Sequence, residues 1–131
     1  MLRQFIIIDD NRDGCFVLSR ALFRHYPAAT LHEFRDFDSA REALANLPPD
    51  GGATLILLHR IPNIGGAQLV RAVREIHDRV PIVALGDPAL GPEILAAGAT
   101  RFLDYEAWLR LGTLVKGLDP GNAELTEKSS A

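Results

Sequence analysis

The sequence predicts an α/β domain: a five-stranded parallel sheet with helices on both of its faces. Short apolar runs recur along the 131-residue chain, and each is followed by a segment whose apolar residues have helical spacing. Most of these runs are continuously apolar, which is typical of strands covered on both faces. Parallel neighbouring strands need crossover helices, so the alternation of strand and helix indicates a parallel sheet.

The first two strand-helix units lie in the amino-terminal part of the chain. Residues 4–8 form an apolar, β-branched run, and a helix is expected over residues 13–25. A second strand is expected over residues 30–34, and it is predicted nearer an edge of the sheet because it is less hydrophobic. The helix expected over residues 39–47 ends at Pro48-Pro49, because proline cannot continue a helix.

The next two units follow a Gly-rich loop. A buried strand is expected over residues 54–58 and a helix over residues 67–78. The fourth strand is expected over residues 81–85, and the turn at residues 86–88 ends it. A short helix over residues 92–97 follows, with a proline suitably placed in its first turn.

The last unit and the end of the chain set the domain limits. A strand is expected over residues 100–103, and Asp104 is the expected N-cap of a final helix that carries Trp108. We expect one domain over residues 1–118. Residues 119–131 are polar and aperiodic, which predicts a flexible carboxyl-terminal tail.

Composition excludes several classes of function. The formal charge is −3, so the chain offers no basic footprint for nucleic acid. No segment approaches the roughly 18 apolar residues that a membrane span needs, and acidic residues interrupt any signal peptide. The single cysteine, Cys15, excludes an intramolecular disulfide and a cysteine-rich zinc site. We therefore expect a soluble, cytoplasmic protein whose partners are proteins.

Four motifs stand in order over residues 4–118. They are Ile6–Asp10, Leu57–Gly66, Pro81–Leu85 and Ala96–Leu103. Together they resemble the receiver domains of two-component response regulators, the CheY-like family. The resemblance implies a flavodoxin-like (βα)5 three-layer sandwich and a stand-alone role in bacterial two-component, or phosphorelay, signalling.

The resemblance also assigns roles to five polar positions. The acidic pair that holds magnesium in the family falls on Asp9 and Asp10, and both carboxylates are present. The phosphoacceptor aspartate falls on Leu58, the phosphate-binding hydroxyl on Gly86, and the phosphate-pairing lysine on Tyr105. The sequence therefore lacks the nucleophile, the hydroxyl and the cation that phosphoryl transfer uses. We expect Leu58 and Gly86 to fill or narrow the former pocket.

The leading hypothesis is a degenerate receiver that is not an enzyme and has no catalytic residue. It would bind a protein partner, such as a signalling kinase, a regulator or an output protein, or form a homodimer, without being phosphorylated. No cofactor is expected, except magnesium weakly bound at Asp9 and Asp10. The alternative reading of this pair is an acidic turn that caps the first helix.

Two other functions stay open. His59 lies beside the acceptor position, so His59 or Asp10 could replace the aspartate chemically, or His59 could be an ordinary polar residue at a strand end. A flavodoxin-like nucleotide- or flavin-binding protein is disfavoured, because the loop after the first strand is acidic and no Gly-x-Gly-x-x-Gly or Walker A motif occurs.

Aromatic residues near the end of the domain predict an interaction surface. It comprises Phe102, Tyr105, Trp108 and Leu109. Phe102 falls on the family's aromatic switch position, and Leu109 lies off the apolar stripe of the last helix, which indicates exposure. In the resembled family this region is a common partner and dimer face. The alternative is that Trp108 packs in the core and Tyr105 covers its edge.

Overall fold

The computed structural model describes residues 2–59 and 65–119. Five parallel strands form one sheet in the order β2-β1-β3-β4-β5. The strands are β1 (Gln4–Ile8), β2 (Thr30–Phe34), β3 (Thr54–Leu58), β4 (Ile82–Gly86) and β5 (Arg101–Asp104). The predicted fold class is confirmed, and the less hydrophobic β2 is an edge strand as expected.

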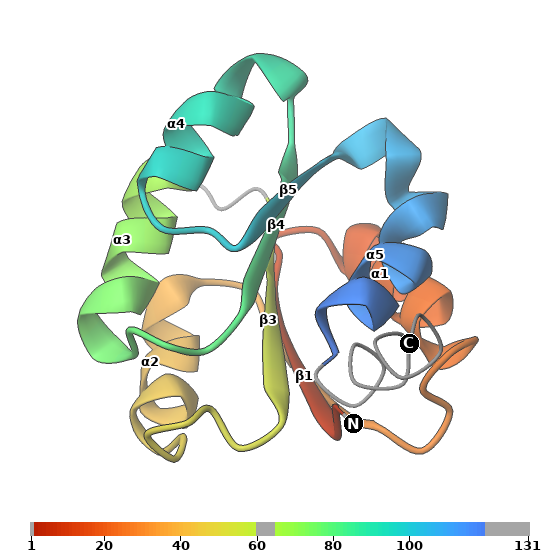
Figure 1. Ribbon diagram of the computed structural model, residues 1–131, viewed down its shortest axis with the longest axis horizontal. Coiled ribbons are helices and arrows are strands. Elements are labelled where there is room, and N and C mark those ends of the chain that lie inside the picture. Colours follow the sequence, from red (N-terminus) through yellow and green to blue (C-terminus); the bar gives the residue numbers. More distant parts are fainter. Residues whose placement is uncertain (1, 60–64, 120–131) are drawn as a thin grey trace, which may run out of the picture.

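The described residues also form five α-helices and two short 3-10 helices. They are α1 (Arg12–Phe23), α2 (Phe37–Ala45), α3 (Gly66–Ile76), the 3-10 helix Pro88–Leu90, α4 (Gly91–Ala96), the 3-10 helix Tyr105–Arg110 and α5 (Leu111–Leu118). Helices α2, α3 and α4 lie on one face of the sheet, and α1 and α5 lie on the other (Figure 1). This is the three-layer arrangement that the alternation of strands and helices predicted.

The two faces of the sheet have separate apolar cores. Alternate residues of a strand point to opposite faces, so Ile8 and Leu58 pack under α3 and α4 while Ile7 and Leu57 pack under α1 and α5. Ile8 and Leu58 are register partners, and Leu58 also pairs with Ala84. The register therefore brings the carboxyl ends of β1, β3 and β4 to one edge of the sheet.

The final predicted helix is divided in the structure. Asp104 is the N-cap as expected, since its Oδ1 accepts a hydrogen bond from the Glu106 N–H at 3.0 Å. A 3-10 helix follows, with a non-helical residue at Ala107, before α5 begins at Leu111. The apolar spacing that predicted one helix could not reveal this change of helix type, because the same side chains face the core on both sides of the break.

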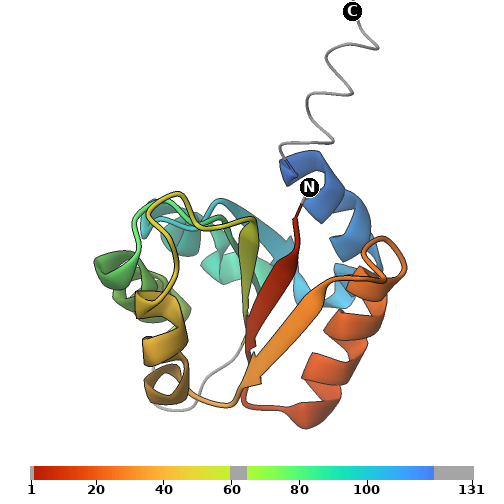
Figure 2. The ribbon, with the colours of Figure 1, turned by 90° about the horizontal axis from the view of Figure 1, so that it is seen from below.

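Asp119 joins the two ends of the domain. We predicted it as the first residue of a flexible tail, but it is buried and ends α5. Its Oδ2 accepts hydrogen bonds from the Tyr26 hydroxyl at 2.8 Å and from the Leu2 N–H at 3.1 Å. The start of β1 accordingly lies beside the end of α5 (Figure 2). The rest of the predicted tail, residues 120–131, lies outside the described residues.

Replacing Tyr26 with phenylalanine tests this contact. Burial raises the pKa of Tyr26 well above its ordinary range, so the hydroxyl remains a donor to Asp119 at neutral pH. We expect Tyr26→Phe to lower the free energy of unfolding by about 1–3 kcal/mol, because the buried carboxylate loses a donor. Urea denaturation measures the change, and an unaltered midpoint would show that the contact does not stabilise the domain.

Candidate functional site

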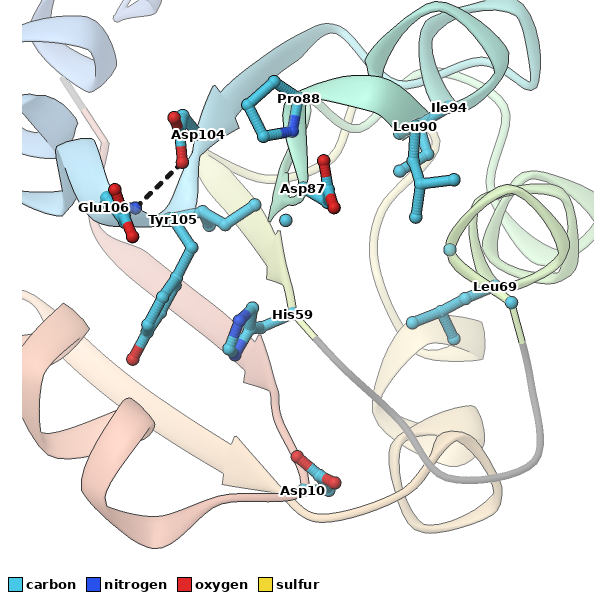
Figure 3. Close-up of a pocket in the computed structure, with 14 residues that line it drawn as sticks. Asp10, His59, Leu69, Asp87, Pro88, Leu90, Ile94, Asp104, Tyr105 and Glu106 are labelled. Carbon is cyan, nitrogen blue, oxygen red and sulfur yellow. Dashed lines mark hydrogen bonds between the residues drawn. The ribbon is translucent and has the colours of Figure 1, made fainter.

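A cavity of about 960 Å³ opens at the carboxyl edge of the sheet. This is where open parallel sheets bind their ligands. The described residues that line it come from the ends of β1, β3, β4 and β5 and from the starts of α3 and α4. Figure 3 shows His59, Tyr105 and Asp10 on one side of the cavity and Leu69, Leu90 and Ile94 on the other.

Asp9 and His59 form a buried pair beside this cavity. Asp9 has no exposed surface and His59 is only 6% exposed. The His59 Nδ1 lies 3.0 Å from the Asp9 Oδ2, and the Asp9 Oδ1 accepts a hydrogen bond from the Asn11 N–H at 2.9 Å. Because a carboxylate only accepts, His59 donates through Nδ1. Both Asp9 oxygens are therefore already engaged by protein donors.

Strand register explains why these two side chains meet. Ile8 and Leu58 are partners in the parallel pair β1-β3, and Asp9 and His59 are the next residue along each strand. Their side chains consequently leave the same face of the sheet, about one strand spacing of 4.8 Å apart. The His59 N–H continues the ladder by donating to the Ile8 carbonyl at 3.0 Å. Backbone pairing thus holds both side chains at hydrogen-bonding distance.

Tyr105 covers the His59 ring. The two rings are stacked, with centroids 4.0 Å apart and planes 11° apart. Tyr105 directly follows Asp104, whose side chain caps the helix that begins there. The capped turn places the phenol ring over the imidazole, so the pair Asp9–His59 is enclosed from that side.

Solved structures with this architecture identify the fold. The signal receiver domain of the response regulator NarL from Mycobacterium tuberculosis superposes with a TM-score of 0.70 and 25% identity, over 92% of this chain and 98% of that one. The receiver domain from Rhodospirillum rubrum gives 0.71 and 21%, over 86% and 92% of the two chains. CheY4 of Vibrio cholerae gives 0.65 and 21%, over 88% and 99%. This chain has the fold of receiver domains.

Sequence comparison adds one curated relative. Stress response regulator protein 1 of the fungus Meyerozyma guilliermondii is 30% identical over 84 residues, which is 63% of this chain and 38% of that protein. This chain therefore spans well under half of the curated relative's length. No protein-family model matches the sequence. The expected bacterial origin stays a prediction, since the similar proteins include a fungal stress response regulator as well as bacterial receiver domains.

Leu58, which the resemblance places at the acceptor position, is part of the core. Leu58 is 2% exposed and packs with Ile8, Leu69 and other residues of the α3-α4 face. It is not among the residues that line the cavity, whereas Gly86 is. A Cβ atom added at Gly86 would meet only a Phe102 ring carbon, at 3.8 Å. Our expectation that Leu58 and Gly86 fill or narrow the former pocket is therefore wrong: Leu58 packs in the core, and Gly86 lines the cavity without adding a side chain to it.

The two carboxylates of the predicted magnesium pair diverge. Asp9 is buried and bound to His59 and Asn11, whereas Asp10 is exposed at the cavity rim. Magnesium needs several oxygen ligands in near-octahedral geometry. Within residues 2–59 and 65–119, no three His, Cys, Asp or Glu side chains are grouped to hold a metal. The residues present do not fit the magnesium site that the receiver fold implies.

The predicted interaction residues differ in their burial and in what they contact. Phe102 is half-buried against the α3-α4 core, and Tyr105 lies over His59. Trp108 packs against the core under α1 and α5, as the alternative reading held. Leu109 is 69% exposed and lines a groove along α1 together with Trp108 and Phe16. Their use as one binding surface stays a prediction.

The absence of a side chain at Gly14 lets α1 pack closely against the buried pair Asp9–His59. A Cβ atom at this helical position would lie 2.5 Å from the Asp9 Oδ2, the oxygen that His59 contacts. Sequence reasoning missed this residue. The available signal was a glycine in a helix interior, which is costly unless close packing requires it.

Gly14→Ala is expected to displace the Asp9 carboxylate and lower the free energy of unfolding by about 1–3 kcal/mol. Gly117→Ala is the matched control, because Gly117 is also in a helix but a Cβ there would meet nothing within 4 Å. We expect that variant to be neutral or stabilised by up to about 1 kcal/mol. Thermal denaturation of both variants measures the contrast, and equal effects would contradict the assigned role of Gly14.

Proposed function

We propose that this receiver domain is a protein-protein interaction module that works without phosphorylation. The observation that carries the proposal is Leu58, which occupies the acceptor position and is buried in the core. A leucine side chain offers no nucleophile, and its burial keeps it away from a phosphodonor. The proposed partner is a signalling kinase, a regulator, an output protein or a second copy of the chain, in the cytoplasm.

The charge around the cavity supports the same proposal. Four carboxylates line it, and no lysine or arginine is among its described lining residues. The four are Asp10, Asp87, Asp104 and Glu106. A transferred phosphoryl group carries negative charge that must be compensated in the transition state. Among the described lining residues it would meet these carboxylates and no lysine or arginine, which disfavours phosphorylation at the described residues of this cavity.

A second candidate function rests on His59. Its ring is oriented by a buried carboxylate and lines the cavity, an arrangement also used to activate histidine as a base or nucleophile. A phosphorylatable regulator that uses His59 as its acceptor is therefore the alternative. The acidic lining described above is the physical argument against it.

Incubation with acetyl phosphate and magnesium chloride, followed by intact-mass measurement, separates the two functions. The interaction module predicts an unchanged mass. An adduct of one phosphoryl group that is acid-labile and stable in base, and that disappears in His59→Gln, would establish the alternative instead. An adduct that is labile in both acid and base would indicate a carboxylate acceptor and would equally contradict the proposal.

No helix within the described residues has both the length and the apolar character required to cross a bilayer.

The groove along α1 is a second place where a partner could contact the domain, because Phe16 and Leu109 are both largely exposed there.

A further inference from the structure

We propose that the cavity binds a basic side chain, arginine or lysine, of a partner protein. This rests on the proposed function, since it names the chemistry of the partner at that site. Three independent features of the cavity carry it: its charge, an unused hydrogen-bond acceptor, and an apolar wall.

The described lining residues of the cavity include acidic side chains but no lysine or arginine, and some of their carboxylate oxygens remain able to bind a cation. The Asp87 Oδ1 accepts a hydrogen bond from the Ala89 N–H at 2.9 Å, and the Asp104 Oδ1 accepts one from the Glu106 N–H at 3.0 Å. Each of these helix-capping bonds uses one carboxylate oxygen and leaves the other beside the cavity. In the view of Figure 3, the Asp87 carboxylate lies between His59 and Leu90. A cation placed there would be attracted by several carboxylates at once.

His59 supplies the unused acceptor. Its Nδ1 donates to Asp9, so in the neutral ring the second nitrogen, Nε2, is an acceptor. The only side-chain hydrogen bond of His59 to another residue of 2–59 and 65–119 is the one from Nδ1. No buried polar side-chain atom of these residues lacks a partner, so Nε2 is open to solvent on the side of the cavity that His59 lines. Nε2 can therefore accept a hydrogen bond from a donor that enters the cavity. Guanidinium and ammonium groups are donors only.

The opposite wall fits the stem of a basic side chain. Leu69 and Ile94 are buried there, and Leu90 is 44% exposed at the rim. Lysine and arginine pack their methylene stems along apolar surface while the charged group meets polar partners. A bare divalent ion would gain nothing from this wall and would find no group of three ligands among the described residues. An anionic group would be repelled. The features together select an organic cation on an aliphatic stem.

The test is an NMR titration of the full chain with N-acetyl-arginine amide. N-acetyl-citrulline amide is the matched probe, because it keeps the shape and lacks the charge. We expect the arginine probe to shift the His59 ring-nitrogen signals in a saturable way and the citrulline probe to bind about tenfold more weakly or not at all. Equal affinity for the two probes, or no shift of the His59 signals, would overturn the proposal.

Two variants test whether the arginine probe binds at the carboxylates of the cavity. Asp87→Asn keeps an oxygen that can cap Ala89 but removes the negative charge beside the cavity, so we expect the arginine probe to bind about tenfold more weakly. Asp38→Asn removes an exposed carboxylate on α2 and should leave binding unchanged. Equal effects of the two variants would show that the probe responds to net charge alone and would overturn the site.

The outcome is separable from that of the proposed function. If neither probe binds and acetyl phosphate leaves the mass unchanged, this inference fails while the interaction module stands. If a phosphoryl adduct forms, the proposed function fails whatever the probes do.

Discussion

Leu58→Asp, which restores a carboxylate at the acceptor position, should lower the free energy of unfolding by about 5 kcal/mol. Leu58 is 2% exposed and lies among aliphatic residues of the α3-α4 core, with Ile8 and Ala84 beside it in the sheet. The substitution removes a buried aliphatic side chain and introduces a carboxylate among aliphatic core residues. Chemical denaturation measures the loss.

Two further variants at Leu58 separate the causes. Leu58→Met conserves volume and should cost less than about 1.5 kcal/mol. Leu58→Asn has the shape of aspartate without its charge, so the difference between Asn and Asp at neutral pH reports the cost of burying the charge. If Leu58→Asp is as stable as the unmodified protein, the side chain at this position must reach the cavity, and the assignment of Leu58 to the core is wrong.

Asp9→Ala is expected to lower the free energy of unfolding by about 3 kcal/mol or more. Asp9 is fully buried, and its removal leaves the His59 Nδ1–H and the Asn11 N–H without their acceptor. Asp10→Ala is the matched control, because Asp10 is the adjacent residue but is exposed. That variant should change stability by no more than about 0.5 kcal/mol.

The difference between Asp9→Ala and Asp10→Ala tests whether Asp9 binds His59 or serves with Asp10 as a metal ligand. Equal and small effects would mean that Asp9 is not committed to His59, and a metal-binding role for the pair would regain support. A double substitution of Asp9 and His59 should cost less than the sum of the two single changes, because each single change leaves the other partner buried and unpaired.

Much of the fold could be predicted from the order of apolar runs. β1, β2 and β3 begin and end where the sequence analysis placed them. β4 and β5 each begin and end one residue later than predicted. Such ends depend on hydrogen bonds across the sheet, for example from the Ile56 N–H to the Pro81 carbonyl at 2.9 Å. Periodicity does not report these bonds.

The site was only partly predictable for a related reason. The resemblance to receiver domains identified Asp9, Leu58 and Gly86 as residues of one sheet edge, but it said only whether the family's residue is kept there, as at Asp9, or replaced, as at Leu58 and Gly86. Whether a side chain turns into the core or towards the cavity depends on strand register and on what packs above it. The strand register places the His59 side chain beside Asp9 and the Leu58 side chain in the core. The close approach of α1 at Gly14 packs that helix against the Asp9 carboxylate.

The central claim is that Asp9 is committed to His59 and that no phosphoryl group enters this crevice. A nitrogen-15 spectrum of the His59 ring, recorded before and after incubation with magnesium chloride and acetyl phosphate, tests it most directly. The account predicts an Nδ1–H signal that persists and an Nε2 signal that does not move. Loss of the Nδ1–H signal on adding magnesium, or a phosphoryl group on Nε2, would contradict it.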